Sequence, residues 1–279
     1  MATRREIFNT LCRAAQCYGE QEARQIAEMI VEKYGVSRNK LIVEPNEELH
    51  IPDLEHIISE LEAWRPVQYI LGSAEFMAMS LKVGEGVLVP RPETEELIEW
   101  IASESAPKAK ILDVGTGSGC IAIALSRAVT ESEVWAMDIS REALTIARNN
   151  AERYAPAVQF VEGDALCDFA TLFDKKFDII VSNPPYIPLS DKASMRPNVV
   201  EYEPHIALFV ADDDPLLFYR SIAHTARRML NDGGRLYFEI YELFAEDMCR
   251  MLREEGYENI TVREDFRGKP RMICAKMSL

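Results

Sequence analysis

The stretch ILDVGTGSGCIAIALS, residues 111–126, decides the fold. It opens on a short apolar strand, continues through glycines at every second position (Gly115, Gly117 and Gly119), and ends in an apolar run of helical spacing. Glycines at such a junction allow the backbone to turn sharply and to approach a ligand, and the first turn of the following helix offers unpaired N–H groups. The stretch therefore predicts a strand, a ligand-binding loop and a helix in direct succession.

Strands and helices alternate from this stretch to the end of the chain. The periodicity predicts strands at residues 111–114, 134–137, 158–161, 177–181 and 235–240, and helices at residues 120–128, 142–153, 216–230 and 244–254. Two closing strands are expected around Val262 and at residues 272–275. Such alternation predicts an α/β protein with a doubly wound, mostly parallel sheet.

The amino-terminal part of the chain predicts helices instead. Apolar residues fall at helical spacing in residues 20–34 and 54–61, which indicates a small helical bundle. Residues 76–83 can alternate like a strand, and Gly84 and Gly86 supply a turn before Val87, so we expect a hairpin between two domains. The expected division is a helical domain at residues 1–72, a β-hairpin linker at 73–90 and a sheet domain at 91–279.

Residues 187–215 show little periodicity. They contain Pro188, Pro197, Pro204 and Pro215 and directly follow the SNPPY motif at residues 182–186. Long irregular segments inside compact domains are usually lids or binding loops, so we expect a lid here.

Composition narrows the class of protein. Of the 279 residues 48% are hydrophobic, and the net charge of −15 opposes the binding of nucleic-acid phosphates. No apolar run reaches the roughly 20 residues of a membrane helix, and nothing resembles a secretory signal, so a cytoplasmic protein without membrane contact is expected. The six cysteines form no C-x-x-C pair and only four histidines are present, which argues against a metal site, and a chain of this length and expected compartment argues against a disulfide framework. Nothing indicates a partner surface of the chain with itself, so we expect a monomer.

Two acidic residues end the strands that follow the glycine loop. Asp138 ends the second strand, where a carboxylate can accept the hydroxyl hydrogens of a ribose. Asp164 ends the third strand and either receives an adenine amino group or caps a helix. The spacing also admits a nicotinamide dinucleotide, because the looser G-x-G-x-x-A pattern is met from Gly117 to Ala122, or a loop that binds nothing.

The sequence SNPPY, residues 182–186, follows an apolar strand, so a doubly wound sheet places it beside the ligand crevice. An amide or aromatic amino nitrogen is a poor nucleophile because its lone pair is delocalised, but its two hydrogens are good donors. The side-chain oxygen of Asn183 and the backbone carbonyl of Pro184 can each accept one and aim the nitrogen at a methyl donor. Pro185 stiffens the turn, and Tyr186 can lie against the flat group. An ordinary Asn-Pro turn is the alternative.

Together with RPVQYILG at residues 65–72 and VLVPRPETE at residues 87–95, these motifs resemble the peptide chain release factor N5-glutamine methyltransferase family (the HemK/PrmC type). The likeness covers nearly the whole chain. The two blocks are its specific part, because N-P-P-Y is also found in adenine-N6 methyltransferases. The resemblance implies a class I, Rossmann-like methyltransferase fold, in which a mixed seven-stranded sheet with an antiparallel final hairpin follows a small helical domain that recognises the substrate.

The resemblance also implies a reaction and a site. The methyl donor would be S-adenosyl-L-methionine, and the acceptor would be the glutamine side-chain amide in the Gly-Gly-Gln motif of a release factor. Asn183 and Pro184 would be catalytic. The residues expected to bind the cofactor are Gly115, Thr116, Gly117, Ser118, Gly119, Asp138, Asp164, Ala165 and Asn183. The residues expected to bind the substrate are Asn183, Pro184, Pro185 and Tyr186.

The chain departs from the family pattern in places. Relatives often carry a large side chain over the adenine where this chain has Ala165, and after Glu239 they usually have glycine one residue on and glutamines nearby, where this chain has IYELF at residues 240–244. Residues 90–94 either close over the cofactor or form an exposed helix start. Three rival functions stay open: a ribosomal-protein glutamine methyltransferase, an adenine-N6 nucleic-acid methyltransferase, and a non-catalytic binding module.

Overall fold

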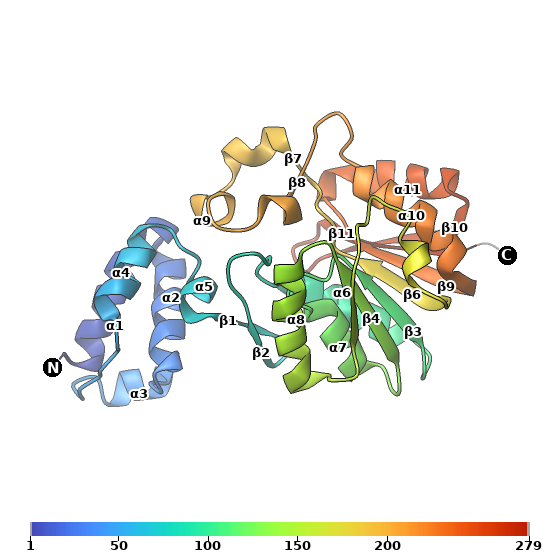
Figure 1. Ribbon diagram of the computed structural model, residues 1–279. Coiled ribbons are helices and arrows are strands. Elements are labelled where there is room, and N and C mark those ends of the chain that lie inside the picture. Colours follow the sequence, from blue (N-terminus) through green and yellow to red (C-terminus); the bar gives the residue numbers. More distant parts are fainter. Residues whose placement is uncertain (1, 278–279) are drawn as a thin grey trace. The chain divides into compact units, whose positions relative to one another are not determined.

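The computed structural model describes residues 2–277 and is shown in Figure 1. The chain separates into two compact units. The first unit runs to Ser73 and also includes Arg196–Tyr202, which belong to the irregular segment between residues 187 and 215. The second unit holds the rest of the chain from Ala74 onward.

The first unit is a bundle of helices around an apolar core. Its helix α1 begins at a capping box, in which the Thr3 hydroxyl accepts the Glu6 N–H and the Glu6 carboxylate accepts the Thr3 N–H. Apolar side chains at helical spacing, such as Ile30 and Leu61, are fully buried in the core. The helices predicted at residues 20–34 and 54–61 are confirmed. The helical elements of this unit are α1 (Arg4–Ala14), η1 (Gln16–Tyr18), α2 (Glu20–Lys33), α3 (Arg38–Val43), α4 (Leu54–Glu62), α5 (Val67–Leu71) and α9 (Pro197–Val200).

A β-hairpin follows the helices, but the sequence placed its turn wrongly. Strand β1 (Ser73–Phe76) pairs with β2 (Met79–Lys82) across Met77 and Ala78, whose φ angles are 45° and 56°. Positive φ at both central residues suits the twist of a two-residue hairpin turn, which glycine or asparagine usually marks. The chain does turn between Gly84 and Val87, yet no strand follows there.

The second unit contains a seven-stranded sheet in the order β10-β11-β9-β6-β3-β4-β5. The five strands from β9 to β5 are parallel, whereas β11 is antiparallel to both β9 and β10. The predicted doubly wound sheet and its antiparallel final hairpin are therefore confirmed. The strands are β3 (Lys110–Val114), β4 (Glu133–Asp138), β5 (Gln159–Glu162), β6 (Phe177–Ser182), β9 (Leu230–Glu239), β10 (Tyr257–Glu264) and β11 (Pro270–Met277).

Helices cover both faces of this sheet (Figure 1). Alternate residues of each central strand point to opposite faces, so Ile111 packs in one apolar core and Leu112 in the other. The first core includes α6 (Pro92–Glu104), α7 (Cys120–Ala128) and α8 (Arg141–Tyr154). The second core includes α10 (Leu217–Met229), α11 (Ala245–Glu254) and η2 (Phe169–Leu172).

The segment after β6 is irregular, as the sequence predicts, but it carries short elements. Strand β7 (Ile187–Pro188) pairs in parallel with β8 (Phe209–Val210), which closes the segment into a loop. Between them lie η3 (Leu189–Ser194), the short helix α9 that belongs to the first unit, and η4 (His205–Ala207). A further short helix, η5 (Glu242–Phe244), follows β9 elsewhere in the chain.

Candidate active site

The glycine loop between β3 and α7 is held by the carboxyl end of β4. The N–H groups of Gly115 and Thr116 both donate to the carbonyl of Met137 at 2.9 Å. The Gly117 N–H donates to the Asp138 carboxylate at 2.8 Å. A Cβ built on Gly115 or Gly117 would meet nothing within 4 Å, so the loop presents bare backbone to the space above it.

Asp113 supports this loop from inside the protein. Its buried Oδ2 accepts hydrogen bonds from the Thr116 hydroxyl at 2.6 Å and from the Ala122 N–H at 3.2 Å, while Oδ1 is buried without a partner among residues 2–277. Burial raises the pKa of Asp113 to about 7, because the ionised carboxylate loses its hydration. The side chain thus joins the loop to the start of α7.

Asp138 stands at the carboxyl end of β4 and lines a cavity above the loop. Its Oδ2 accepts the Gly117 N–H, and its Oδ1 accepts the Ser140 N–H at 2.9 Å. Burial raises the pKa of Asp138, and these two N–H donors act in the opposite direction. Each carboxylate oxygen can accept a second hydrogen bond, so Asp138 is fixed in place and can still bind two hydroxyl groups.

Asp164 and Ala165 lie at the edge of the same cavity, beyond the end of β5. The Asp164 carboxylate accepts the Leu166 N–H at 2.8 Å and the Cys167 thiol at 3.6 Å, so it caps its own turn. The Ala165 carbonyl accepts the Ser221 hydroxyl at 2.7 Å, which fastens this turn to α10. Asp164 thus caps a turn and not the helix that the sequence suggested, and it still lines the cavity.

The SNPPY motif begins where β6 ends beside the glycine loop. Ser182 is fully buried, pairs with Val114 in the sheet, and donates its hydroxyl to the Val114 carbonyl at 2.6 Å. The next three residues, Asn183, Pro184 and Pro185, line the cavity. Within residues 2–277 the Asn183 side chain makes no hydrogen bond, so its amide oxygen and nitrogen are available to a ligand.

Tyr186 ends the motif and does not line the cavity. Its hydroxyl donates to the Glu239 carboxylate at 3.2 Å, and its ring stacks on Tyr241 with centroids 6.0 Å apart and planes at 15°. Burial raises the pKa of both Tyr186 and Glu239. The tyrosine is therefore a neutral donor whose ring is held at its hydroxyl end and on one face.

One cavity of about 340 Å³ joins the glycine loop to the SNPPY motif. Its lining brings together most of the residues that the sequence singled out. These are Gly115, Thr116, Gly117, Ser118, Asp138, Asp164, Ala165, Asn183, Pro184 and Pro185. Gly119 and Tyr186 are not among the lining residues. Gly119 precedes α7 and approaches α8, and Tyr186 lies behind the motif.

Another wall of the cavity comes from the segment after the hairpin. The sequence left open whether residues 90–94 close over the cofactor or form an exposed helix start. Gly86, Val87, Leu88, Pro90, Arg91 and Thr94 all line it. Arg91 pairs with the buried Glu203 at 2.5 Å, and Glu203 also accepts the Val89 N–H at 3.1 Å. The block VLVPRPETE at residues 87–95 is the sequence feature that could have identified this wall. Ile206, Ala207, Phe218 and Ile222 complete the lining from distant segments, and no motif pointed to them.

Other kinds of site find no support in the described part of the chain. Residues 2–277 contain no group of three or more His, Cys, Asp or Glu side chains arranged to hold a metal ion. All six cysteines are free thiols. In the same range, no helix combines the length and the apolar character needed to span a bilayer.

Comparison with known proteins gives consistent matches. The Methyltransferase small domain family matches residues 92–201. A release factor glutamine methyltransferase of Bacteroides thetaiotaomicron is 46% identical over 223 residues, which are 80% of this chain and 80% of that protein. One of Flavobacterium psychrophilum is 40% identical over 268 residues, 93% of each chain.

A solved structure extends the comparison to the fold. The crystal structure of a methyltransferase from Pyrococcus furiosus is similar with a TM-score of 0.55 at 17% identity, covering 73% of this chain and 91% of that one. Together with the family match, this likeness confirms the class I methyltransferase fold expected from the sequence.

Proposed function

Because the chain belongs to the release factor glutamine methyltransferases, which are S-adenosyl-L-methionine-dependent enzymes, we propose that it methylates the side-chain amide nitrogen (N5) of the glutamine in the Gly-Gly-Gln motif of a peptide chain release factor. One observation carries the proposal: Asn183 and Pro184 line the same cavity as the glycine loop and Asp138. A methyl donor held by the loop and an amide held by the SNPPY motif would share that cavity.

The cavity residues fit such a donor. A volume of about 340 Å³ is in the range of small-ligand sites. The bare backbone at Gly115 and Gly117 allows close approach, and the fixed carboxylate of Asp138 can accept both ribose hydroxyls. Asp164 and Ala165 would border the adenine, where the small Ala165 leaves space rather than a stacking surface. The cofactor-binding residues that we propose are Gly115, Thr116, Gly117, Ser118, Gly119, Asp138, Asp164, Ala165 and Asn183.

When bound, the cofactor supplies a methyl group that its sulfonium already activates. The protein then needs to position the acceptor. The Asn183 side-chain oxygen and the Pro184 carbonyl would each accept one hydrogen of the substrate amide, which orients the nitrogen and draws electron density toward it. Pro185 stiffens the turn that carries both acceptors. Such positioning can supply of order 7–11 kcal/mol of the barrier.

We assign recognition of the release factor to the helical domain at residues 1–72. The linker at 73–90 would join it to the methyltransferase domain at 91–279. A monomer that acts in the cytoplasm suits a protein substrate of the translation machinery. The resemblance of the chain to release factor enzymes over 93% of its length supports these assignments.

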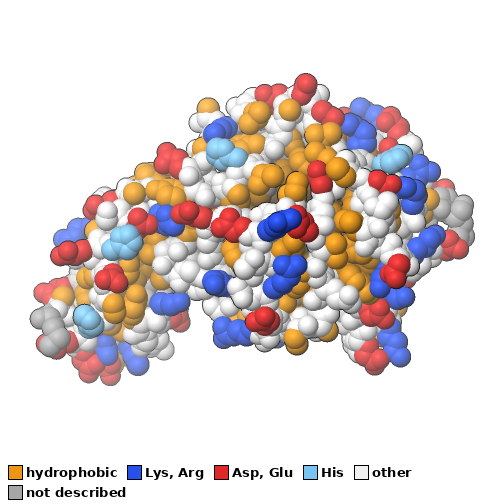
Figure 2. Space-filling model, viewed as in Figure 1, with side chains coloured by type: hydrophobic (Ala, Val, Ile, Leu, Met, Phe, Trp, Pro, Cys, Tyr) orange, Lys and Arg blue, Asp and Glu red, His pale blue; other side chains and the backbone are white. Residues whose placement is uncertain are grey.

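Two other acceptors define the alternatives. A ribosomal-protein glutamine would use the same chemistry, and an adenine amino group could also bind between Asn183 and Pro184. The net charge of −15 opposes a nucleic-acid substrate. On the face drawn in Figure 2, Lys and Arg side chains lie interspersed with Asp and Glu side chains.

One assay separates these possibilities. The protein is incubated with methyl-labelled S-adenosyl-L-methionine and either release factor, ribosomal protein or DNA. We expect label only on the release factor, and none on a factor whose Gly-Gly-Gln glutamine is replaced by alanine. Asn183→Ala should abolish transfer while the melting temperature stays near that of the wild type. Label on DNA or ribosomal protein alone, or near-normal turnover by Asn183→Ala, would overturn the proposal.

A further inference from the structure

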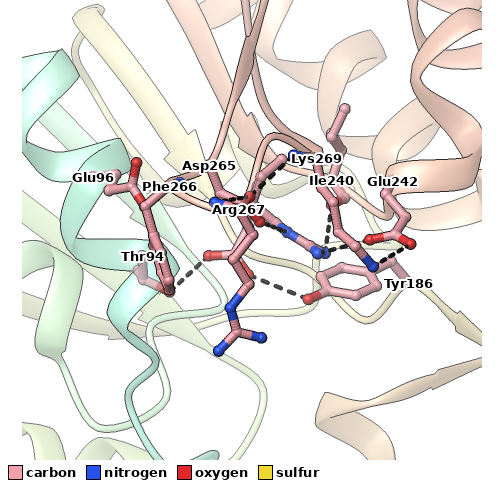
Figure 3. A network of polar contacts seen from close by, with 11 residues as sticks. Thr94, Glu96, Tyr186, Ile240, Glu242, Asp265, Phe266, Arg267 and Lys269 are labelled. Atoms are coloured by element: carbon pink, nitrogen blue, oxygen red, sulfur yellow. Dashed lines mark hydrogen bonds and ion pairs between the residues drawn. The ribbon is translucent and has the colours of Figure 1, made fainter.

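A buried carboxylate lies directly behind the SNPPY motif. Glu239 is the last residue of β9, the strand beside β6, and follows Phe238, which pairs with Ser182 in the sheet. Only 2% of Glu239 is exposed. Its carboxylate accepts hydrogen bonds from the hydroxyls of Thr94 and Tyr186, both of which are labelled in Figure 3.

Each oxygen of this carboxylate has its own hydroxyl donor. The Tyr186 hydroxyl donates to Oε1 at 3.2 Å, and the Thr94 hydroxyl donates to Oε2 at 2.6 Å. Thr94 is itself buried, lies in the first turn of α6 and lines the cofactor cavity. Glu239 therefore connects the cavity wall to the tyrosine of the motif.

Packing alone does not account for a carboxylate here. Burial disfavours its ionised form and raises its pKa. An apolar side chain of similar volume would avoid that cost, yet it would leave the hydroxyls of Thr94 and Tyr186 without this acceptor. The carboxylate is thus suited to holding the two hydroxyls rather than to filling space.

The backbone around Glu239 is fixed as well. Its carbonyl accepts the Tyr219 hydroxyl at 3.0 Å, and the next N–H, that of Ile240, donates to the Arg271 carbonyl at 2.8 Å. The Arg271 guanidinium is bound in turn by Asp265 and Glu242, at 3.3 Å and 3.1 Å (Figure 3). The carboxylate consequently has little freedom to follow a moving tyrosine.

We propose that Glu239 is a positioning residue for methyl transfer that acts through Tyr186. By holding the Tyr186 hydroxyl, Glu239 fixes the end of the SNPPY turn, whose Asn183 and Pro184 line the cavity where the substrate amide would bind. Thr94 holds the second carboxylate oxygen and so keeps the first one aimed at Tyr186. The inference rests on the proposed function, because it concerns the orientation of the same amide.

A double-mutant cycle tests this role. Tyr186→Phe, Glu239→Gln and the double variant are compared with the wild type for kcat and KM with release factor and for the Kd of S-adenosyl-L-methionine measured by calorimetry. We expect each single variant to lower kcat by about tenfold, and the double variant to be no worse than the poorer single one. The Kd should stay within about twofold, since Glu239 does not line the cavity.

Three further variants give the test a second readout and a control. Thr94→Val should lower kcat more than Thr94→Ser, which retains the hydroxyl that holds Glu239, and this comparison stands even if Glu239→Gln does not fold. Tyr257→Phe removes a buried hydroxyl bonded to the Ala223 carbonyl, which contacts neither Glu239 nor Tyr186, and its kcat should match the wild type below its melting temperature. The inference would be overturned if the losses of kcat in Tyr186→Phe and Glu239→Gln multiplied in the double variant. A full kcat in Glu239→Gln would overturn it as well. A wild type inactive on every release factor would instead refute the proposed function.

Discussion

Arg91 and Glu203, which are 112 residues apart in the sequence, form an ion pair at 2.5 Å at the wall of the cavity that the glycine loop lines. The Glu203 carboxylate is 1% exposed and also accepts the Val89 N–H, whereas the Arg91 side chain is 34% exposed. Glu203 directly follows Tyr202, which in the helical unit donates its hydroxyl to the Ala63 carbonyl. The buried Glu203 carboxylate thus holds the cavity wall at the Arg91 side chain and at the Val89 backbone.

Removal of this carboxylate should weaken both stability and cofactor binding. Glu203→Ala leaves the Val89 N–H without its acceptor, so we expect the free energy of unfolding to fall by about 1–3 kcal/mol. The Kd for S-adenosyl-L-methionine should rise because Arg91 is released from its partner. Urea unfolding and calorimetry measure the two effects. Arg250→Ala, which breaks an exposed pair with Asp247, is the control and should cost less than about 1 kcal/mol. Equal losses in both variants would contradict the prediction.

Two glycines of the loop should respond differently to a methyl group. Both have positive φ, where alanine costs about 1–2 kcal/mol. At Gly119 a Cβ would also lie 3.0 Å from the Ile123 Cδ1 and 3.1 Å from the Ala147 Cβ, whereas at Gly117 it would meet nothing within 4 Å. Gly119→Ala should therefore lower the melting temperature more, and Gly117→Ala should weaken cofactor binding more than its loss of stability explains. Differential scanning calorimetry measures the melting temperatures, and titration calorimetry measures the Kd of the cofactor. The variant with the lower melting temperature, Gly119→Ala, should not be the one with the weaker cofactor binding.

The sheet and its ligand loop could be read from the sequence because their signals are local. Strand–helix alternation fixes which strand ends meet, so Asp138 and Asn183 were expected at one edge, and both line the cavity. The hairpin turn was placed wrongly because Met77 and Ala78 adopt positive φ without the glycine that usually announces it.

Contacts between distant segments could not be read in the same way. Glu203 and Glu239 look like any other acidic residues in the sequence, and their roles arise from partners 112 and 53 residues away, Arg91 and Tyr186. The membership of Arg196–Tyr202 in the helical unit rests similarly on the ion pair of Arg196 with Glu22 and on the stacking of Arg65 over the Tyr202 ring. Such pairings follow from the tertiary fold, and no periodicity encodes them.

The stability of the protein should depend on pH through Asp113. Its pKa is about 7 in the folded protein, against an ordinary 3.8, so the folded state binds this proton more tightly than the unfolded chain between those values. This contribution is complete below pH 4 and is lost as the pH rises through 7, with a slope of at most about 1.4 kcal/mol per pH unit. Asp113→Asn should remove that slope. Chemical denaturation from pH 5 to 8.5 compares the two proteins, and parallel curves would contradict the assignment.

Tyr241 should contribute to activity mainly through its ring. The ring stacks on Tyr186 at 6.0 Å, and the hydroxyl donates to Asp191 at 2.8 Å in the segment that follows the SNPPY motif. Tyr241→Phe keeps the stack and loses only a hydrogen bond to a half-buried carboxylate, so kcat should fall no more than about threefold. Tyr241→Ala loses both contacts and frees one face of Tyr186, which should lower kcat by about tenfold, since an aromatic pair contributes about 0.5–1.5 kcal/mol. Steady-state kinetics with release factor give both values. If Phe and Ala variants were impaired equally, the hydroxyl bond to Asp191 rather than the stack would hold Tyr186 in place.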